Sequence, residues 1–209
     1  MNKDTALIVI DMQRGFINEE SSCYIKGAKA TIPACAKMIR GCREMGIPVF
    51  FVNRLYRSNG SDVEHTRFPY WLKGGKPISQ GCEENISSDM PEEFCPCDKD
   101  YFIRKPRFSA FFNTELDLIL RRLGIRNIII IGTTTPNCVR TTCYDGISLE
   151  YNVAVVSDCT SSATDEIQEC NLRDMENVGA QIISCEGFLS GEEKINDSSA
   201  LVQEFVRGE

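Results

Sequence analysis

Short apolar runs alternate with helix-like segments along most of this chain, and that alternation restricts the fold more than any other feature of the sequence. Residues 6–10, 47–52, 128–131 and 153–156 are runs rich in Val, Ile, Phe and Ala. Continuous apolar strands of this kind are typical of parallel sheets that are covered by helices on both faces. The sequence therefore predicts an α/β protein, a three-layer α/β/α sandwich with a Rossmann-like six-stranded parallel sheet.

Two further strands complete the predicted sheet, and helices are expected between the strands. They are residues 101–103, where the pattern is weaker, and residues 181–184. Glycine often follows the last turn of a helix, and Gly46 and Gly124 stand at such positions. The expected helices span residues 28–45, 116–123 behind a cap at Asn113 or Thr114, the stretch from the end of the fourth strand to about residue 150, and part of 164–178.

The segment 54–98 lacks this regular alternation. It is rich in proline and glycine, and a connection of this length inside one domain is usually functional or contains small elements of its own. We expect it to form a lid over a pocket or a contact between subunits. Because its aromatic side chains carry apolar area that is costly to expose, we expect a homo-oligomer. These side chains are Phe68, Tyr70, Trp71 and Phe94.

Length, charge and cysteine content narrow the class of protein further. The 209 residues suit one domain, residues 1–209, that ends in a polar tail at 190–209 with a short helix near 200–205. The net charge of −7, without a basic stripe, argues against nucleic acid and anionic membranes as partners. The apolar runs are too short to span a membrane, and the first residues do not have the pattern of a signal peptide.

Cysteine is unusually frequent in this chain, which has eleven. Without a secretion signal, this content indicates reduced thiols and a cytoplasmic location. Most free cysteines behave as small apolar side chains. Core packing is therefore expected for Cys35, Cys42, Cys159, Cys170 and Cys185.

One cysteine stands at a position that favours reactivity. Cys138 lies in residues 132–140, directly between the apolar strand 128–131 and a predicted helix. At a helix N-terminus the dipole favours a thiolate, and free backbone N–H groups can stabilise an oxyanion. Asp11 and Lys105 follow two other predicted strands, and ligands bind beyond the carboxyl ends of such strands.

These three side chains offer a coherent chemistry. The carboxylate of Asp11 can take the proton of the Cys138 thiol, and the ammonium of Lys105 can favour the thiolate and developing negative charge. The single histidine, His65, lies in the segment 54–98, so carboxylate activation of the thiol is more plausible than a Cys–His dyad. Separately, each residue also fits a structural role: Asp11 as a strand end, Lys105 as a surface lysine and Cys138 as packing.

Three motifs together resemble the isochorismatase-like cysteine hydrolases, a superfamily that includes nicotinamidases, N-carbamoylsarcosine amidase, ureidoacrylate amidohydrolases and biuret-type hydrolases. The motifs are Asp11-Met12-Gln13, residues 105–111 and residues 132–139, and the likeness covers roughly residues 4–188. The resemblance implies a catalytic triad of Asp11, Lys105 and Cys138. It also implies a cis peptide between Thr133 and Thr134, oxyanion donors in the N–H groups of Thr134 and Cys138, and assembly into oligomers.

The chain departs from the nicotinamidases at their metal site. Where they carry Asp and His ligands after the second strand, residues 53–57 read Asn-Arg-Leu-Tyr-Arg. We therefore expect no metal and no other cofactor, and Cys82, Cys95 and Cys97 are a weak set of zinc ligands. Arg54 or Arg57 could bind a substrate carboxylate. The candidate substrate-binding residues are Phe16, Asn53, Arg54, Trp71 and Phe108, with Tyr70 as a further pocket-wall candidate.

The sequence thus predicts a cysteine-dependent amidohydrolase that cleaves a C–N bond of a small amide or of a ureido or carbamoyl compound through a thioester. The expected partner is a small-molecule substrate. Alternatives are a nicotinamidase-type deamidase and an inactive binding or scaffold protein on the same fold. A redox thiol protein is less favoured because the chain has no Cys-x-x-Cys motif.

Overall fold

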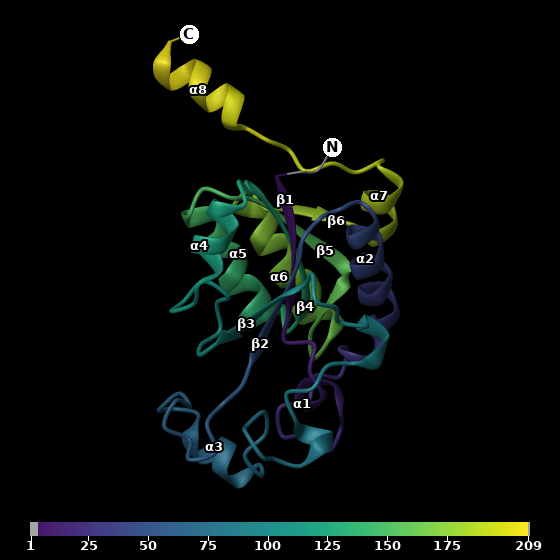
Figure 1. Ribbon diagram of the computed structural model, residues 1–209, viewed down its shortest axis with the longest axis vertical. Coiled ribbons are helices and arrows are strands. Elements are labelled where there is room, and N and C mark those ends of the chain that lie inside the picture. The colour runs from purple at the N-terminus through teal and green to yellow at the C-terminus, as the bar shows by residue number, and fades with distance from the viewer. Residues whose placement is uncertain (1–3, 209) are drawn as a thin grey trace.

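Six parallel strands form the central sheet of the protein, whose computed structural model describes residues 4–208 (Figure 1). The strand order is β3-β2-β1-β4-β5-β6, with parallel pairing throughout. The predicted α/β/α architecture and Rossmann-like sheet are therefore confirmed. The strands are β1 (Thr5–Ile10), β2 (Val49–Arg54), β3 (Tyr101–Lys105), β4 (Asn127–Thr133), β5 (Asn152–Ser161) and β6 (Gln181–Ile183).

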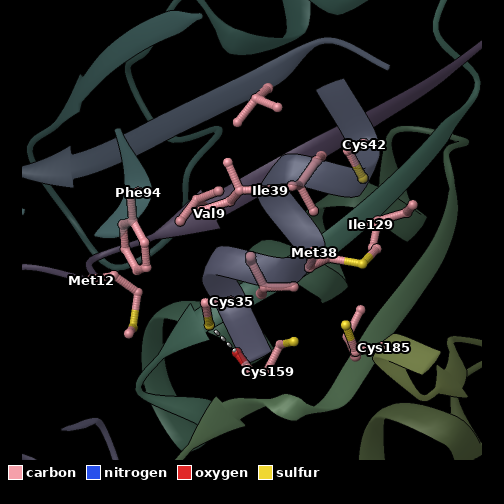
Figure 2. Packing of buried hydrophobic residues seen from close by; sticks show 14 of the residues in the cluster. Val9, Met12, Cys35, Met38, Ile39, Cys42, Phe94, Ile129, Cys159 and Cys185 are labelled. Atoms are coloured by element: carbon pink, nitrogen blue, oxygen red, sulfur yellow. Dashed lines mark hydrogen bonds between the residues drawn. The ribbon is translucent and has the colours of Figure 1, made fainter. Parts of the chain in front are cut away.

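Helices cover both faces of the sheet, and the alternation of side chains along each strand serves both layers. In β1, Leu7 and Val9 pack on the face covered by α2 (Ile32–Glu44) and α7 (Cys185–Ser190); part of this core is shown in Figure 2. Ala6, Ile8 and Ile10 belong to the opposite core. That second face is covered by α4 (Leu116–Arg122), α5 (Arg140–Ser148) and α6 (Asp165–Asn177).

Gly132, near the end of β4, is required by the close approach of β1. A Cβ atom at this position would lie 2.0 Å from the carbonyl oxygen of Ile10, and the backbone has a φ of +114°. Only glycine tolerates both conditions. The glycine therefore lets the chain leave β4 directly beside the end of β1.

The segment 54–98 folds against the carboxyl edge of the sheet, and its first residue, Arg54, still belongs to β2. Short helix α1 (Arg14–Ile17) hydrogen-bonds to it, and Figure 1 shows α1 and α3 at the same end of the molecule. Trp71 and Phe94 are buried within the chain, so of the four aromatic side chains expected to need cover only Phe68 and Tyr70 are exposed; Leu72 of the same segment is exposed as well. The small elements of this segment are α3 (Phe68–Lys73), η2 (Glu84–Ile86) and η3 (Glu92–Phe94).

Several boundaries differ from the predicted ones. The helix after β4 begins with a π-helical turn, η4 (Thr135–Val139), and a 3₁₀ turn, η1 (Lys29–Thr31), precedes α2. Strand β5 extends through a polar stretch to Ser161, because this stretch pairs with the end of β4 after a register shift. The prediction that Cys170 packs in the core is wrong: α6 turns this residue to solvent, while Asn171 and Met175 are buried.

The tail contains a helix at the expected place, α8 (Ser199–Arg207), which stands away from the body at the end opposite α3 (Figure 1). Its side chains at Leu201, Val202, Phe205 and Val206 are exposed. Within residues 4–208, no helix combines the length and apolar character needed to cross a membrane.

Candidate active site

The side chains of Asp11, Lys105 and Cys138 meet at the carboxyl edge of the sheet. They lie near the topological switch point between β1 and β4, from which successive strands are added in opposite directions. The Nζ atom of Lys105 lies 2.7 Å from Oδ2 of Asp11 and 3.4 Å from Sγ of Cys138. Asp11 and Lys105 are fully buried, and Cys138 is 3% exposed. The structure therefore brings together the three residues that the sequence analysis singled out, at the place where doubly wound sheets bind ligands.

The carboxylate of Asp11 retains free acceptor capacity. It follows β1 in the left-handed region, with a φ of +49°. Its contact with Lys105 is an ion pair, and neither oxygen accepts a hydrogen bond from residues 4–208. Lys105 is held independently, because its Nζ atom also donates to the carbonyl of Arg107 at 3.1 Å. A buried carboxylate with open lone pairs is suited to accept a proton from a neighbouring group.

The surroundings of Cys138 raise the pKa of its thiol above the ordinary value, to about 11. Burial is the largest cause and the charge of Asp11 acts in the same direction, whereas the charges of Lys105 and Arg54 lower the pKa. Desolvation thus opposes the thiolate that the helix N-terminus was expected to favour, because burial disfavours the charged form. A thiol in this state becomes a nucleophile only when a neighbouring group removes its proton.

The loop before Cys138 is fixed by the end of β5. The peptide bond between Thr133 and Thr134 is cis, as the resemblance implied. The hydroxyl of Ser161 donates to the Thr133 hydroxyl at 3.0 Å, and the hydroxyls of Thr134 and Thr135 donate to the Ser161 carbonyl at 3.3 and 2.9 Å. Ser161 was not anticipated, because the polar end of β5 resembles a loop in the sequence.

Two neighbouring cavities open onto this region. The inner cavity, of about 190 Å³, is lined by Cys138 and Thr134 together with the predicted residues Phe16, Arg54 and Phe108. The outer cavity, of about 340 Å³, is lined by Trp71 and Tyr70. Both cavities share Ser22, Cys23, Tyr56 and Arg67 as lining residues.

The remaining predicted substrate-binding residues lie elsewhere. Asn53 lines neither of these two cavities, although its Oδ1 atom is buried without a hydrogen-bond partner among residues 4–208. Arg57 points outward, with 64% of its side chain exposed, and pairs with Asp62 at the surface. His65 is exposed, in agreement with a surface position. Only Arg54 of the two candidate arginines faces the inner cavity.

The guanidinium of Arg54 is buried and held on one side. Its Nη1 atom donates to the Tyr56 hydroxyl at 2.7 Å and to Oε1 of Glu64 at 2.8 Å, and Tyr56 donates to Oε2 of Glu64 at 2.7 Å. The guanidinium carbon lies 4.8 Å from the centre of the Phe108 ring. Gln13 fixes the backbone, since its amide donates to the Arg54 carbonyl at 2.8 Å and accepts from the Arg54 N–H at 2.9 Å.

Sequence reasoning missed Glu64, Tyr56 and Arg67, which belong to a segment without periodicity and carry no motif. Gln13 did have a signal, because it lies in the motif that begins at Asp11. For the others, only the folded segment reveals that they surround Arg54.

A metal does not fit this site. Residues 4–208 contain no group of three His, Cys, Asp or Glu side chains arranged to hold an ion. Cys95 and Cys97 are exposed, and Cys82 is half-buried. At the end of β2 the chain places the cation Arg54. Burial lowers the pKa of this guanidinium, but nearby negative groups raise it by more, so its pKa lies above the ordinary value. A fixed positive charge disfavours a second cation in the same cavity.

The sheet order and the helices on both faces place the chain in the class of doubly wound α/β proteins, with a thiol, a carboxylate and a lysine buried at the switch point of the sheet. The chain belongs to the isochorismatase family: the family model described as Isochorismatase domain matches residues 5–187.

Individual relatives agree with this assignment. A protein of Arabidopsis thaliana named probable inactive nicotinamidase is 39% identical over 183 residues, covering 86% of this chain and 91% of the relative. A ureidoacrylate amidohydrolase of Azorhizobium caulinodans is 32% identical over 184 residues, covering 78% of this chain and 79% of the relative. The crystal structure of an isochorismatase family protein from Desulfovibrio vulgaris superimposes with a TM-score of 0.83 at 34% identity, covering 90% of this chain and 97% of that one.

Proposed function

We propose that this protein is a cysteine-dependent hydrolase that cleaves a C–N bond of a small amide or of a ureido or carbamoyl compound through a thioester. The observation that carries the proposal is the buried cluster in which Lys105 contacts both Asp11 and Cys138. Relatives support the reaction type, since one is named as an amidohydrolase that acts on ureidoacrylate. The inner cavity, at about 190 Å³, is below the usual range for drug-sized ligands and suits a small substrate.

The proposed reaction begins with proton transfer. Asp11 takes the thiol proton as Cys138 Sγ attacks the carbonyl carbon, and the carbonyl oxygen becomes an oxyanion. The N–H groups of Thr134 and Cys138 receive this oxyanion, and Lys105 stabilises the negative charge nearby. The C–N bond then breaks, the leaving nitrogen takes the proton from Asp11, and ammonia or an amine departs from a thioester.

Hydrolysis of the thioester repeats the same exchange with water. Asp11 takes a proton from water as its oxygen attacks the thioester carbon, and the C–S bond breaks. The thiolate of Cys138 recovers that proton, and the product leaves as a carboxylic or carbamic acid. Because Asp11 gains and loses one proton in each half, the carboxylate is restored for the next cycle.

The test is turnover of a panel of amides, ureas and N-carbamoyl compounds, measured as ammonia release. Cys138→Ala should abolish turnover and keep the fold, because this change removes only the nucleophile. Cys170→Ala, on the solvent face of α6, is the matched control and should have normal turnover. Undiminished turnover by the Cys138 variant would refute the proposal.

The same panel separates the alternatives. A preference for nicotinamide would indicate a nicotinamidase-type deamidase. Absence of turnover with every compound, in a protein that binds them, would indicate a binding or scaffold protein, a role suggested by the relative whose name includes the word inactive. The intact cluster of Asp11, Lys105 and Cys138 supports the enzyme, because it brings together the groups that the proposed reaction needs.

We further propose a cytoplasmic homo-oligomer that takes a small molecule as its partner, without nucleic acid or membrane. The free state of all eleven cysteines supports a reducing compartment. The exposed apolar side chains of α8 support association of chains. The net charge of −7 supports the absence of polyanionic partners.

A further inference from the structure

Arg54 has more hydrogen-bond donors than the protein uses. Its side chain is 2% exposed, and the Nη1 atom is engaged by Tyr56 and Glu64. The Nε and Nη2 atoms have no partner among residues 4–208. Buried donors of a charged group are rarely left unpaired. Because Arg54 lines the inner cavity together with Cys138, the missing acceptor is expected there.

The unused edge of Arg54 has a defined shape. Nε and Nη2 form the side of the guanidinium that binds a carboxylate through two parallel N–H donors. Glu64 and Tyr56 hold the opposite side, and the Phe108 ring lies against the guanidinium plane. The pair of donors formed by Nε and Nη2 is therefore fixed before any ligand binds, which reduces the entropy lost on binding.

The balance of charges also favours an anion. The cations that line the inner cavity or contact the cluster are Arg54, Arg67 and Lys105, and the carboxylates are Asp11 and Glu64. With Cys138 protonated, one positive charge is left over. Arg67 lies 5.5 Å from the Phe108 ring, on the wall shared by the two cavities. A ligand with one negative charge would balance the site.

We propose that Arg54 anchors a carboxylate of the substrate through its Nε and Nη2 atoms, so that the enzyme acts on small monocarboxylic acids that carry the amide or ureido group. This inference rests on the proposed function. Glu64 and Tyr56 are positioning residues, because they hold the guanidinium on the side opposite Nε and Nη2; Tyr56 also lines the cavity. Arg54 thus determines specificity, while Asp11, Lys105 and Cys138 perform the chemistry.

Binding can be measured without turnover in the Cys138→Ala background by isothermal titration calorimetry. The probes are N-carbamoylglycine, its homologues longer by one and two methylenes, and the neutral amide of each acid. The acid whose length fits should bind, and its amide should bind at least about 100-fold more weakly, since two charge-assisted hydrogen bonds are lost. No preference for an acid over its amide at any length would overturn the proposal.

Variants then assign the preference to Arg54. Arg54→Gln combined with Glu64→Gln, which avoids a buried unpaired carboxylate, should abolish the preference for the acid. Arg54→Lys keeps the positive charge but removes the two parallel N–H donors of the guanidinium, and it should weaken acid binding about tenfold. Arg57→Gln, three positions along and at the surface, is the matched control and should bind like the parent. An unchanged preference in either Arg54 variant would contradict the assignment.

The two proposals fail in different ways. If the acids bind in an Arg54-dependent manner but the protein with Cys138 intact releases no ammonia, the proposed function is wrong and the anion site stands. If neutral ureas or amides are hydrolysed in a Cys138-dependent manner and the Arg54 variants have the same kcat/KM for acids and amides, the anion site is wrong and the proposed function stands.

Discussion

At the scale of single residues, the acidity of the Cys138 thiol depends on desolvation and on three neighbouring charges. Burial and the Asp11 carboxylate raise the pKa of the thiol, whereas Lys105 and Arg54 lower it. The result is a neutral thiol next to a carboxylate that can receive its proton. Under the proposed function, the neutral thiol would not react with other electrophiles before a substrate carbonyl is in place, since the thiolate is the reactive form.

Replacement of Asp11 by Asn should separate thiol acidity from turnover. Loss of the negative charge should lower the pKa of Cys138 from its value of about 11, so that alkylation of the Cys138 peptide begins at lower pH. Turnover should nevertheless fall by roughly 10²–10⁴-fold, because the base is gone. The pH dependence of iodoacetamide labelling, read by mass spectrometry, and ammonia release measure the two effects. Asp98→Asn at the surface is the control; a rise in the Cys138 pKa would contradict the assigned charge effect.

Lys105 is also expected to matter for stability. Lys105→Met leaves the Asp11 carboxylate buried without its cation, and breaking a buried pair in this way typically costs about 3–5 kcal/mol. The double variant Asp11→Asn with Lys105→Met removes both charges and should recover part of the loss. Urea unfolding of the two variants provides the comparison. Equal stability of the single variant and the parent would mean that the ion pair is not formed in solution.

At the scale of elements, the sequence predicted the strands that are buried on both faces. It did not predict the strand residues that are extended only because a neighbouring strand pairs with them. Runs such as residues 128–131 are apolar because both faces of β4 are covered, so composition alone reveals them. The polar second half of β5 is a strand only because β4 lies beside it, and no local pattern encodes that neighbour. For the same reason, Asp11, Lys105 and Cys138 could be found from strand ends, while Glu64 and Tyr56 could not.

The contact between β1 and β4 leads to a prediction about Gly132. Gly132→Ala places a Cβ atom 2.0 Å from the Ile10 carbonyl oxygen at a positive φ, so the two strand ends must separate. We expect a loss of more than about 3 kcal/mol in the free energy of unfolding, or failure to fold. Gly124→Ala has a positive φ but open space around its Cβ position, and it should cost only about 1 kcal/mol. Thermal melts would distinguish the two, and equal costs would show that the approach of β1 is not the cause.

At the scale of the whole molecule, α8 is the best candidate for a contact between chains. It projects from the body and exposes four apolar side chains, Leu201, Val202, Phe205 and Val206. Such a surface is costly in water and is usually covered by a partner. The segment 54–98, in contrast, buries three of its five aromatic residues, Tyr56, Trp71 and Phe94, inside its own chain, so it contributes less to an interface than the sequence suggested.

Removal of residues 197–209 should therefore reduce the oligomeric state and leave turnover per chain unchanged, since α8 lies far from the Cys138 end of the molecule. Multi-angle light scattering at micromolar concentration would report the mass. Leu201→Glu with Phe205→Glu is a milder variant and should have the same effect. A full-length protein that is already monomeric would contradict the prediction of a homo-oligomer.

The residues of the buried cluster and the residues that surround Arg54 come from different parts of the fold. Asp11, Lys105 and Cys138 sit where strands of the sheet end, whereas Tyr56, Glu64 and Arg67 belong to the irregular segment outside it. Under the proposed function, mutations in that segment are expected to alter which molecules bind without displacing Asp11, Lys105 or Cys138. In evolution, an ancestral enzyme of this kind could acquire new substrates by drift in one surface loop, and a laboratory library confined to residues 55–67 should diversify selectivity while most clones retain catalysis.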